Sequence, residues 1–358
     1  MRVSPACPRF AIPCGVAPLF SDGCQMVQFA VHCGWRNRFA DGSGMSYYLG
    51  VDGGGTKTDC VLLDASGRLL GRGTAGPSNP LRCGFPAALE ALDVAAEQTL
   101  AAAQLDVGRV TAVCVGLAGA GRPRVVKRVM AHLVERFPAA DVHVTTDLEV
   151  ALEAAVGAGP GVVLVAGTGS AALGRSPSGR MARAGGWGPW IGDEGSAFEI
   201  GRRAVQAIAR VRDRLAPVTL LSDSIPAALA CPNWETLVER VAENPQEIFP
   251  RIFPLVVEAA EQEDATAREI LFSSALHLSR LAASVIRRLQ MAEQEFLLAR
   301  AGGVFGHSRL LDSAVDALLV GVAPRARIEL LRTAPAIGAA RLAQRLLSAD
   351  AKAHGRAG

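Results

Sequence analysis

The sequence predicts an α/β protein with two lobes, each built on a mixed β-sheet flanked by helices. A buried strand runs into a glycine-rich turn at residues 49–59, and the same design returns at residues 162–174. Strands and helices alternate between the two turns, which is typical of layered α/β domains. The spacing of about a hundred residues between the turns favours one layered unit in each half of the chain.

The first lobe begins with a meander. Apolar alternation predicts three antiparallel strands, at residues 48–53, 57–64 and 68–75, with a tight turn at Asp64–Gly67. Helical and strand periodicity then alternate, which predicts a helix at 86–103, a strand at 110–117, a helix at 123–137, a strand at 142–146 and a helix at 147–156.

The second lobe starts near Gly161 with two or three strands. A mainly helical block is expected at residues 194–290, followed by short strands at 296–300 and 326–330. Pro335 begins a closing helix, because proline is favoured in the first turn of a helix.

Residues 1–46 are expected to precede the fold. Four prolines interrupt them, and no helical or strand periodicity appears. The apolar stretch at residues 12–20 is broken by two of these prolines, so it lacks the continuous core of a signal peptide. We expect either a disordered extension or an upstream start codon, with Met45 as the true start.

Composition favours a cytoplasmic enzyme with no membrane or nucleic-acid partner. The net charge of +3 is too small to indicate a polyanionic surface as partner. No run of about eighteen apolar residues appears. The eight cysteines show no paired ligand spacing, so reduced thiols are expected.

The first glycine-rich turn has the chemistry of a phosphate-binding loop. Asp52 ends the strand, and Gly53–Gly55 let the backbone bend and present N–H groups to a polyanion. Thr56 and Lys57 add donors, and Asp52 can hold a hydrated metal ion. Taken alone, an ordinary hairpin explains this turn. The second turn, Gly167–Ser170, repeats its design, which favours two lobes closing on one nucleotide.

In these motifs the chain resembles the superfamily of actin, sugar kinases and heat-shock ATPases. Within it, the chain is most similar to the N-acetylglucosamine kinase family, which is grouped with the activator ATPases of benzoyl-CoA reductase and 2-hydroxyacyl dehydratase. The resemblance covers about residues 47–349. Its motifs are Asp52–Thr58, Asn79, Thr145–Asp147, Gly167–Ser170, Gly185–Gly188, Gly192–Ser196, Gly302–Val304 and Pro335–Gly338.

The resemblance implies an actin-like, ribonuclease H-like ATPase fold. Residues 47–157 are then the N-terminal lobe and 158–334 the C-terminal lobe, with the helix 335–349 packing back on the first lobe. It also implies an ATP- and Mg²⁺-dependent kinase that phosphorylates the 6-hydroxyl of an amino sugar, most closely N-acetylglucosamine. A homodimer is expected.

Asp147 is the implied catalytic base. It follows a strand and begins a helix, where open α/β sheets place groups that contact ligands. Capping of that helix is the structural alternative for this side chain.

The other implied sugar contacts are less distinctive by sequence alone. Trp187 lies between two glycines, and its side chain could pack against a sugar ring or fill a space in the core. Asn79 is of a residue type that is common in turns without any ligand. Ala171 departs from the family, because animal-type members carry an Asn there that contacts the sugar. The full implied set is Asn79, Asp147, Ser170, Ala171, Gly186, Trp187, Gly188 and Asp193.

The implied ATP site draws on both lobes. Lys57 either reaches phosphate or faces solvent, and His307 either lies near the adenosine or is a surface helix residue. The implied residues are Gly54, Gly55, Thr56, Lys57, Thr168, Gly169, Gly303 and His307, with Asp52 for the metal ion.

Three other functions remain as alternatives. A glucosamine kinase differs only in the sugar. An activator-type ATPase of a partner enzyme would hold an iron–sulfur cluster on paired cysteines, and Cys83, Cys114 and Cys231 show no such arrangement. A sugar-responsive repressor would need a helix-turn-helix before the first strand, which residues 1–46 cannot supply.

Overall fold

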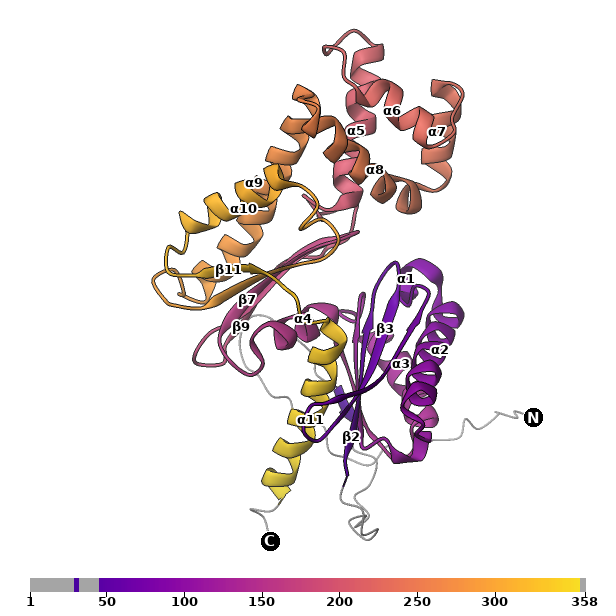
Figure 1. Cartoon of the computed structure of the whole chain (residues 1–358), viewed down its shortest axis with the longest axis vertical. Coiled ribbons are helices and arrows are strands. Elements are labelled where there is room, and N and C mark those ends of the chain that lie inside the picture. The colour runs from indigo at the N-terminus through magenta and orange to yellow at the C-terminus, as the bar shows by residue number, and fades with distance from the viewer. Residues whose placement is uncertain (1–28, 32–44, 355–358) are drawn as a thin grey trace, which may run out of the picture.

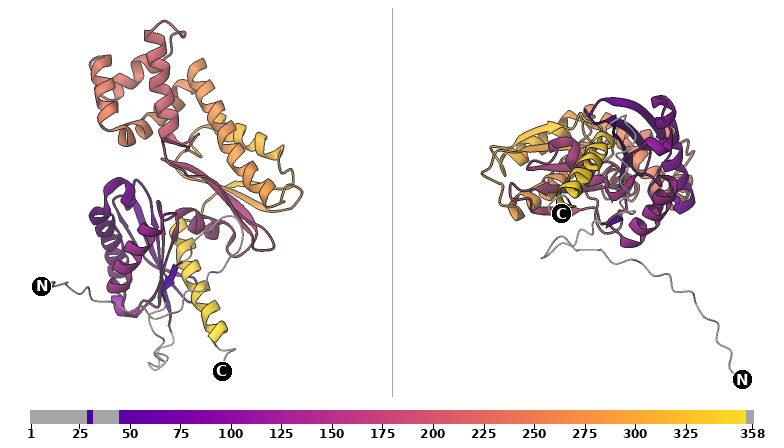
Figure 2. Two further views of the ribbon diagram at one scale, coloured as in Figure 1. Left: turned by 180° about the vertical axis from the view of Figure 1, so that it is seen from behind. Right: turned by 90° about the horizontal axis from the view of Figure 1, so that it is seen from below.

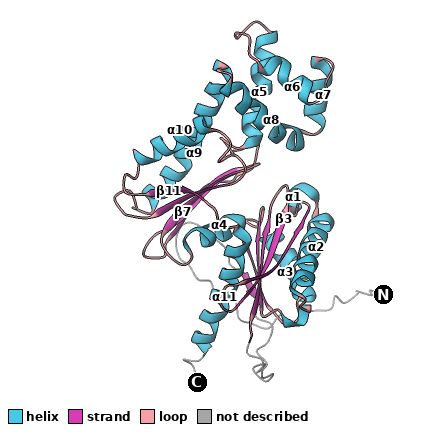
Figure 3. Cartoon of the chain, in the orientation of Figure 1, coloured by secondary structure: helices cyan, strands magenta, loops and turns pink. Residues whose placement is uncertain are grey.

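The computed structural model describes residues 29–31 and 45–354 of the chain and shows two α/β lobes (Figure 1). This confirms the predicted fold class, two mixed sheets flanked by helices (Figure 3). Most predicted elements begin and end within two residues of the observed ones.

The N-terminal lobe contains a mixed sheet of strand order β1-β6-β5-β2-β3-β4. Strand β2 is antiparallel to β3 and parallel to β5, and β5 is parallel to β6. The strands are β1 (Phe29–Val31), β2 (Tyr47–Gly53), β3 (Thr58–Asp64), β4 (Leu69–Ala75), β5 (Ala112–Leu117) and β6 (Asp141–Thr146). The helices are α1 (Pro80–Cys83), α2 (Phe85–Ala103), α3 (Pro123–Arg136), α4 (Asp147–Val156) and α11 (Pro335–His354), with the 3-10 turn η1 at Val107–Arg109.

Strand β1 lies within the 46 residues that we expected to precede the fold. It pairs antiparallel with β6 at the edge of the sheet. The remainder of that expectation, on residues 1–28 and 32–44, lies outside the described residues.

The C-terminal lobe contains a five-stranded sheet of order β11-β10-β7-β8-β9. Its strands are β7 (Gly161–Ala166), β8 (Ser170–Arg175), β9 (Met181–Gly185), β10 (Leu297–Ala301) and β11 (Arg327–Leu330). Its helices are α5 (Ala197–Arg212), α6 (Leu221–Ala228), α7 (Trp234–Glu243), α8 (Pro245–Glu261), α9 (Ala265–Arg288) and α10 (Arg309–Val320).

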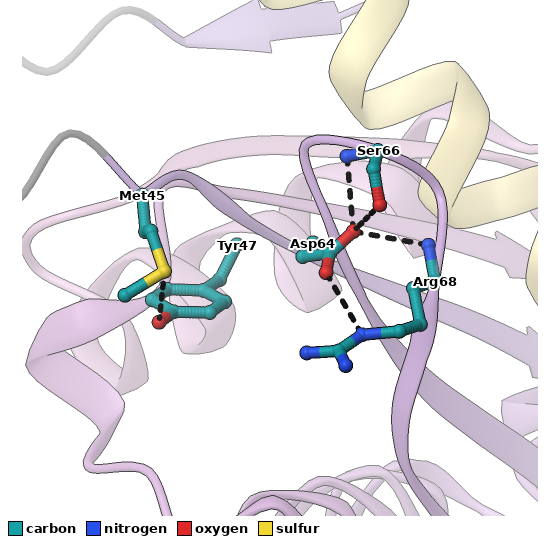
Figure 4. A network of polar contacts seen from close by, with 5 residues as sticks. All are labelled: Met45, Tyr47, Asp64, Ser66 and Arg68. Atoms are coloured by element: carbon teal, nitrogen blue, oxygen red, sulfur yellow. Dashed lines mark hydrogen bonds and ion pairs between the residues drawn. The ribbon is translucent and has the colours of Figure 1, made fainter.

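The turn between β3 and β4 shows why the meander forms as predicted. The carboxylate of Asp64 accepts hydrogen bonds from the main-chain N–H groups of Ser66 (2.9 Å) and Arg68 (3.0 Å), and Gly67 adopts φ = +83° (Figure 4). A turn is stable locally when an aspartate side chain accepts the backbone N–H two residues ahead and a glycine takes the position with positive φ. The bonds from Ser66 and Arg68 hold the pKa of Asp64 below its usual value.

Helix α4 lies between the two sheets. One of its sides packs with α11 and β5 of the N-terminal lobe, and another packs on β7, β8 and β10 of the C-terminal lobe. On the second side, Leu148, Ala151 and Leu152 share a buried cluster with Val163 and Leu173. The start of α4 is therefore fixed at the junction of the lobes.

Helix α11 lies against the N-terminal sheet, beside β2 and α4 (Figure 2). Two glycines permit this close approach, because a Cβ on Gly50 would collide with the backbone of Ala336 and Ala340, and one on Gly338 would collide with the carbonyl oxygen of Val150. The last helix of the chain thus completes the first lobe.

Among the described residues, α9 alone is long and apolar enough to cross a membrane, by length and composition. In the structure 56% of its most apolar window is buried inside the protein. It packs on α8, α10 and the C-terminal sheet, as a core helix does.

Candidate functional site

The first phosphate-type turn joins β2 to β3 and is tied to the loop after β4. The N–H of Gly54 donates to the carbonyl of Lys57 (3.0 Å), which closes the turn. The carbonyl of Gly54 accepts the N–H groups of Ser78 (3.1 Å) and Asn79 (3.2 Å). The side chains of Thr56 and Lys57 are exposed, which is compatible with both alternatives for Lys57, contact with phosphate or with solvent.

Asp52, at the end of β2, lies in a region with excess negative charge. Burial raises its pKa to about 7, with Asp147 and Asp59 adding to the rise and Lys57 opposing it. Asp59 already has a partner, because its carboxylate binds Arg72 through two hydrogen bonds of 2.8 and 2.7 Å. A divalent cation at Asp52 would balance this charge. Among the residues described, no group of three or more His, Cys, Asp or Glu side chains could hold a metal ion.

Asp147 is the first residue of α4, directly after β6. Capping of this helix is done by Thr146, whose Oγ1 accepts the N–H of Glu149 (3.3 Å) while Glu149 Oε2 accepts the N–H of Thr146 (3.2 Å). The capping alternative for Asp147 is therefore wrong. Its half-buried carboxylate makes a bond to the N–H of Leu148 (3.0 Å), and burial raises its pKa.

Arg183, on β9, is a candidate site residue that no motif of the sequence marks. Burial raises the pKa values of Asp147 and Asp193, and the positive charge of the Arg183 guanidinium lowers both of them. It also donates to the carbonyls of Gly185 (3.3 Å) and Gly186 (2.9 Å). A Cβ on Gly121, in the N-terminal lobe, would lie 3.3 Å from its Nη1, so Arg183 stands where the lobes meet. The one feature of the sequence that could have indicated Arg183 is its position three residues before Gly186.

Asn79 caps the short helix α1, where its Oδ1 accepts the N–H of Leu81 (3.0 Å). This local role leaves its side-chain NH₂ group for another partner. A Cβ on Gly119, in the loop after β5, would lie 3.1 Å from Oδ1, so the two loops are in contact.

The second phosphate-type turn joins β7 to β8. The N–H of Gly167 donates to the carbonyl of Gly169 (2.9 Å), and the N–H of Val304 donates to the carbonyl of Ala166 (3.0 Å). Gly303 is exposed, and a Cβ there would meet open space. His307 is also exposed, but it lies in the turn before α10, so its assignment to a surface helix is wrong. The turn and the Gly303 segment thus lie side by side.

Asp193 is buried with 7% of its surface exposed, and its backbone has φ = +62°. Burial raises its pKa, while bonds from the N–H groups of Ser170 and Gly188 oppose this rise. A Cβ on Gly169 would lie 2.9 Å from its Oδ2. The cap of α5 is Ser196, so Asp193 instead links the second turn to the loop after β9.

Trp187 exposes 70% of its surface, so it does not plug the core. The loop around it bends back on itself, with the N–H of Gly192 donating to the carbonyl of Gly188 (2.9 Å). Ala171 is buried beneath this loop, because a Cβ on Gly186 would lie 3.2 Å from its Cβ. Ser170 donates its hydroxyl to the carbonyl of Glu194 (2.8 Å).

The structure joins several of the predicted residues into two groups. Asp52 and Asp147 interact at the lobe junction, and Ser170, Gly188 and Asp193 form a second group. The charge of Arg183 acts on Asp147 in the first group and on Asp193 in the second. Within the described chain, no hydrogen bond links the Gly54–Lys57 turn to the Gly167–Ser170 turn.

These features define a class of protein: two α/β lobes, each with a glycine-rich turn suited to phosphate, and a carboxylate at their junction. The model of the BadF/BadG/BcrA/BcrD ATPase family matches residues 49–343, so the chain belongs to this family.

Individual relatives agree with this assignment. The chain is 30% identical over 312 residues to the N-acetyl-D-glucosamine kinase of Dictyostelium discoideum, covering 83% of this chain and 97% of that protein. It is 28% identical over 303 residues to the N-acetylmuramic acid/N-acetylglucosamine kinase of Clostridium acetobutylicum, covering 84% and 99%. A solved structure of a candidate N-acetylglucosamine kinase from Chromobacterium violaceum superposes with a TM-score of 0.65 at 26% identity, covering 84% and 99%. The predicted actin-like sugar kinase fold is thereby confirmed.

Proposed function

We propose that this sugar kinase transfers the γ-phosphoryl group of ATP to the 6-hydroxyl of N-acetylglucosamine. The observation that carries the proposal is Asp147, a carboxylate at the lobe junction that is not needed to cap its helix. The family is one of ATPases, and the relatives named above act on amino sugars. ATP is available in the cytoplasm, where we place the protein.

In the proposed mechanism, Asp147 accepts the proton of the attacking hydroxyl. Phosphoryl transfer needs little covalent chemistry from the protein, so positioning and charge do most of the work. The raised pKa of Asp147 suits this role, because a base works best when its pKa approaches the working pH. The charge of Arg183 keeps the carboxylate form accessible.

The phosphates are proposed to bind between the two glycine-rich turns. Main-chain N–H groups near Gly55 and Gly169 and the hydroxyls of Thr56 and Thr168 would donate to phosphate oxygens. Mg²⁺, when bound, would screen phosphate charge. Asp52 would hold the ion, because the charges of Asp147 and Asp59 nearby leave this region with excess negative charge.

The sugar is proposed to lie beside Asn79, Trp187 and Asp193. Trp187 is 70% exposed, so its indole is available to an apolar sugar face or an acetyl group. A free amine would carry positive charge and would need a carboxylate of its own, whereas Asp147 and Asp193 are assigned to hydroxyls. Ala171 contributes apolar surface in place of an amide, and a lost neutral hydrogen bond costs only about 0.5–1.5 kcal/mol.

The test is a comparison of kcat/KM for N-acetylglucosamine and glucosamine with ATP under one set of conditions, with the position of the phosphate read by NMR. We expect the acetylated sugar to be preferred and the phosphate to be on the 6-hydroxyl. A tenfold higher value for glucosamine would instead make the protein a glucosamine kinase. ATP hydrolysis that no sugar stimulates would point to the activator-type ATPase.

A further inference from the structure

Arg82 lies against the first phosphate-type turn, and no motif of the sequence marks it. It belongs to the short helix α1, three residues after Asn79. A Cβ on Gly55 would lie 2.7 Å from its Nη1, 3.4 Å from its Cδ and 3.6 Å from its Cζ. The guanidinium therefore covers Gly55, between the phosphate turn and the loop proposed to contact the sugar.

Two nitrogens of Arg82 are held by the other lobe. Its Nε donates to Oε1 of Gln246 (3.2 Å), and its Nη2 donates to the carbonyl oxygen of Gln246 (2.5 Å). Gln246 lies in the first turn of α8. Nη1, which lies against Gly55, makes no hydrogen bond to any residue that the structure describes.

The charge of Arg82 has no acidic partner in the described part of the chain, where its hydrogen bonds go to neutral oxygens. The side chain is half-buried, and this burial lowers its pKa. A charge that is partly removed from water is unfavourable unless an opposite charge pairs with it. A guanidinium is the side chain best suited to pair with phosphate oxygens.

We propose that Arg82 binds the terminal phosphate of ATP through its free Nη1 edge, while Gln246 holds the guanidinium from the opposite lobe. This inference rests on the proposed function, because it takes the Gly54–Lys57 turn as the phosphate site. It makes Arg82 a phosphate ligand that spans the two lobes, and it assigns to Lys57, which is exposed, a lesser part in binding.

The test compares two nucleotides that differ by the terminal phosphate. Calorimetry measures the Kd of ADP and of a non-hydrolysable ATP analogue, both with Mg²⁺, for the full chain and for Arg82→Gln. We expect the analogue to bind at least about tenfold more weakly to the variant, as loss of a charge-assisted hydrogen bond implies, with ADP affinity unchanged within twofold. Arg82→Lys keeps the charge and is expected to lose less.

Two further variants sharpen the result. Gln246→Ala removes the Oε1 contact that helps to hold the guanidinium but keeps the carbonyl contact, so it should weaken binding of the ATP analogue relative to ADP by less than Arg82→Gln does. Arg251→Gln removes an exposed cation of α8 that pairs with Glu247 and should change neither value. Melting temperatures report whether each variant is folded. If Arg82→Gln does not fold, the two Kd values are compared for Arg82→Lys instead.

Equal weakening of both nucleotides would overturn the inference, because Arg82 would then act only on the arrangement of the lobes. Unchanged affinity for the analogue would overturn it as well. If the unaltered protein bound neither nucleotide, the proposed function itself would fail, which is a different result.

Discussion

The proposed catalytic base, Asp147, is the first residue of α4. Thr146 and Glu149 cap α4 through reciprocal bonds, so Asp147, whose carboxylate accepts the N–H of Leu148, is not the N-cap of the helix. Helix α4 fixes this carboxylate between two packed sheets, and burial raises its pKa. The Asp147 side chain thus has a fixed position and a raised pKa.

The substitution Asp147→Asn is expected to lower kcat at least about a hundredfold, because loss of a general base costs two to four orders of magnitude. Sugar and ATP should still bind, since Asn keeps the size of the side chain. Steady-state kinetics and equilibrium binding check both parts. Near-normal turnover in this variant, together with an inactive Asp193→Asn, would show that the base is misassigned.

The pH profile should depend on Arg183. Transfer needs the carboxylate form of Asp147, so kcat falls as the pH drops through its pKa. Burial raises this pKa and Arg183 lowers it, so Arg183→Gln raises the pKa further and moves the acid limb of kcat to higher pH. Part of the lost activity should return at alkaline pH.

Arg288→Gln is the matched control for Arg183. Arg288 is near the same strand and donates to the main-chain carbonyl of Arg183 (2.6 Å) without involving the guanidinium of that residue. The acid limb of the kcat–pH profile of Arg288→Gln should match that of the unaltered protein. An unmoved limb in Arg183→Gln would mean that Arg183 only shapes the Gly185–Gly186 loop.

At the level of elements, the contact between β2 and α11 depends on a residue with no side chain. Gly50 lies in the middle of β2, and the backbone of α11 fills the place that a Cβ would take. Asp52 is the penultimate residue of the same strand, which leads into the first phosphate-type turn, so the packing of α11 also fixes the start of the candidate site.

Gly50→Ala is therefore expected to lower the free energy of unfolding by about 1–3 kcal/mol, the usual cost of overpacking. Gly108→Ala is the control, because a Cβ there meets open space, and its effect should stay within about 0.5 kcal/mol. Chemical denaturation of both variants checks this. Equal stabilities would show that α11 shifts to make room.

At the level of the whole molecule, the lobes are joined by a buried carboxylate on α4. Glu153 is 3% exposed and accepts bonds from Nε (3.1 Å) and Nη2 (2.7 Å) of Arg345 on α11. Its Oε2 also lies 3.5 Å from Nη2 of Arg175 on β8, in the other lobe. A single acid therefore links α4, the closing helix and the second sheet.

Glu153→Gln is expected to destabilise the protein by on the order of 2 kcal/mol. Breaking a fully buried ion pair costs about 3–5 kcal/mol, and the value is reduced here because Arg345 is 42% exposed. Glu97→Gln, which removes an exposed pair with Arg136, should cost only about 0–1 kcal/mol. Thermal and chemical unfolding measure the difference, and a cost no larger than the control would show that Glu153 does not join the lobes.

Local features of the fold could be predicted well from the sequence. Helix α4 has the predicted bounds, and β2 and β3 begin within one residue of them, because hydrophobic periodicity and turn residues act over a few positions. Strand β1 was missed, since three residues carry too little pattern to be recognised. The surface-helix alternative for His307 is wrong, because Ser308 caps α10 and the helix begins only after it.

The sequence by itself determined the glycine turns, the order of strands and helices, and the acids that end strands, because each depends on backbone preferences and polarity within one segment. Only the tertiary structure decided which charges meet. Arg183 beside Asp147, Arg82 over Gly55, and Glu153 between Arg175 and Arg345 join residues from separate elements. Coulomb interactions and desolvation depend on distance and burial in space, so no local pattern in the chain marks these arginines among the others.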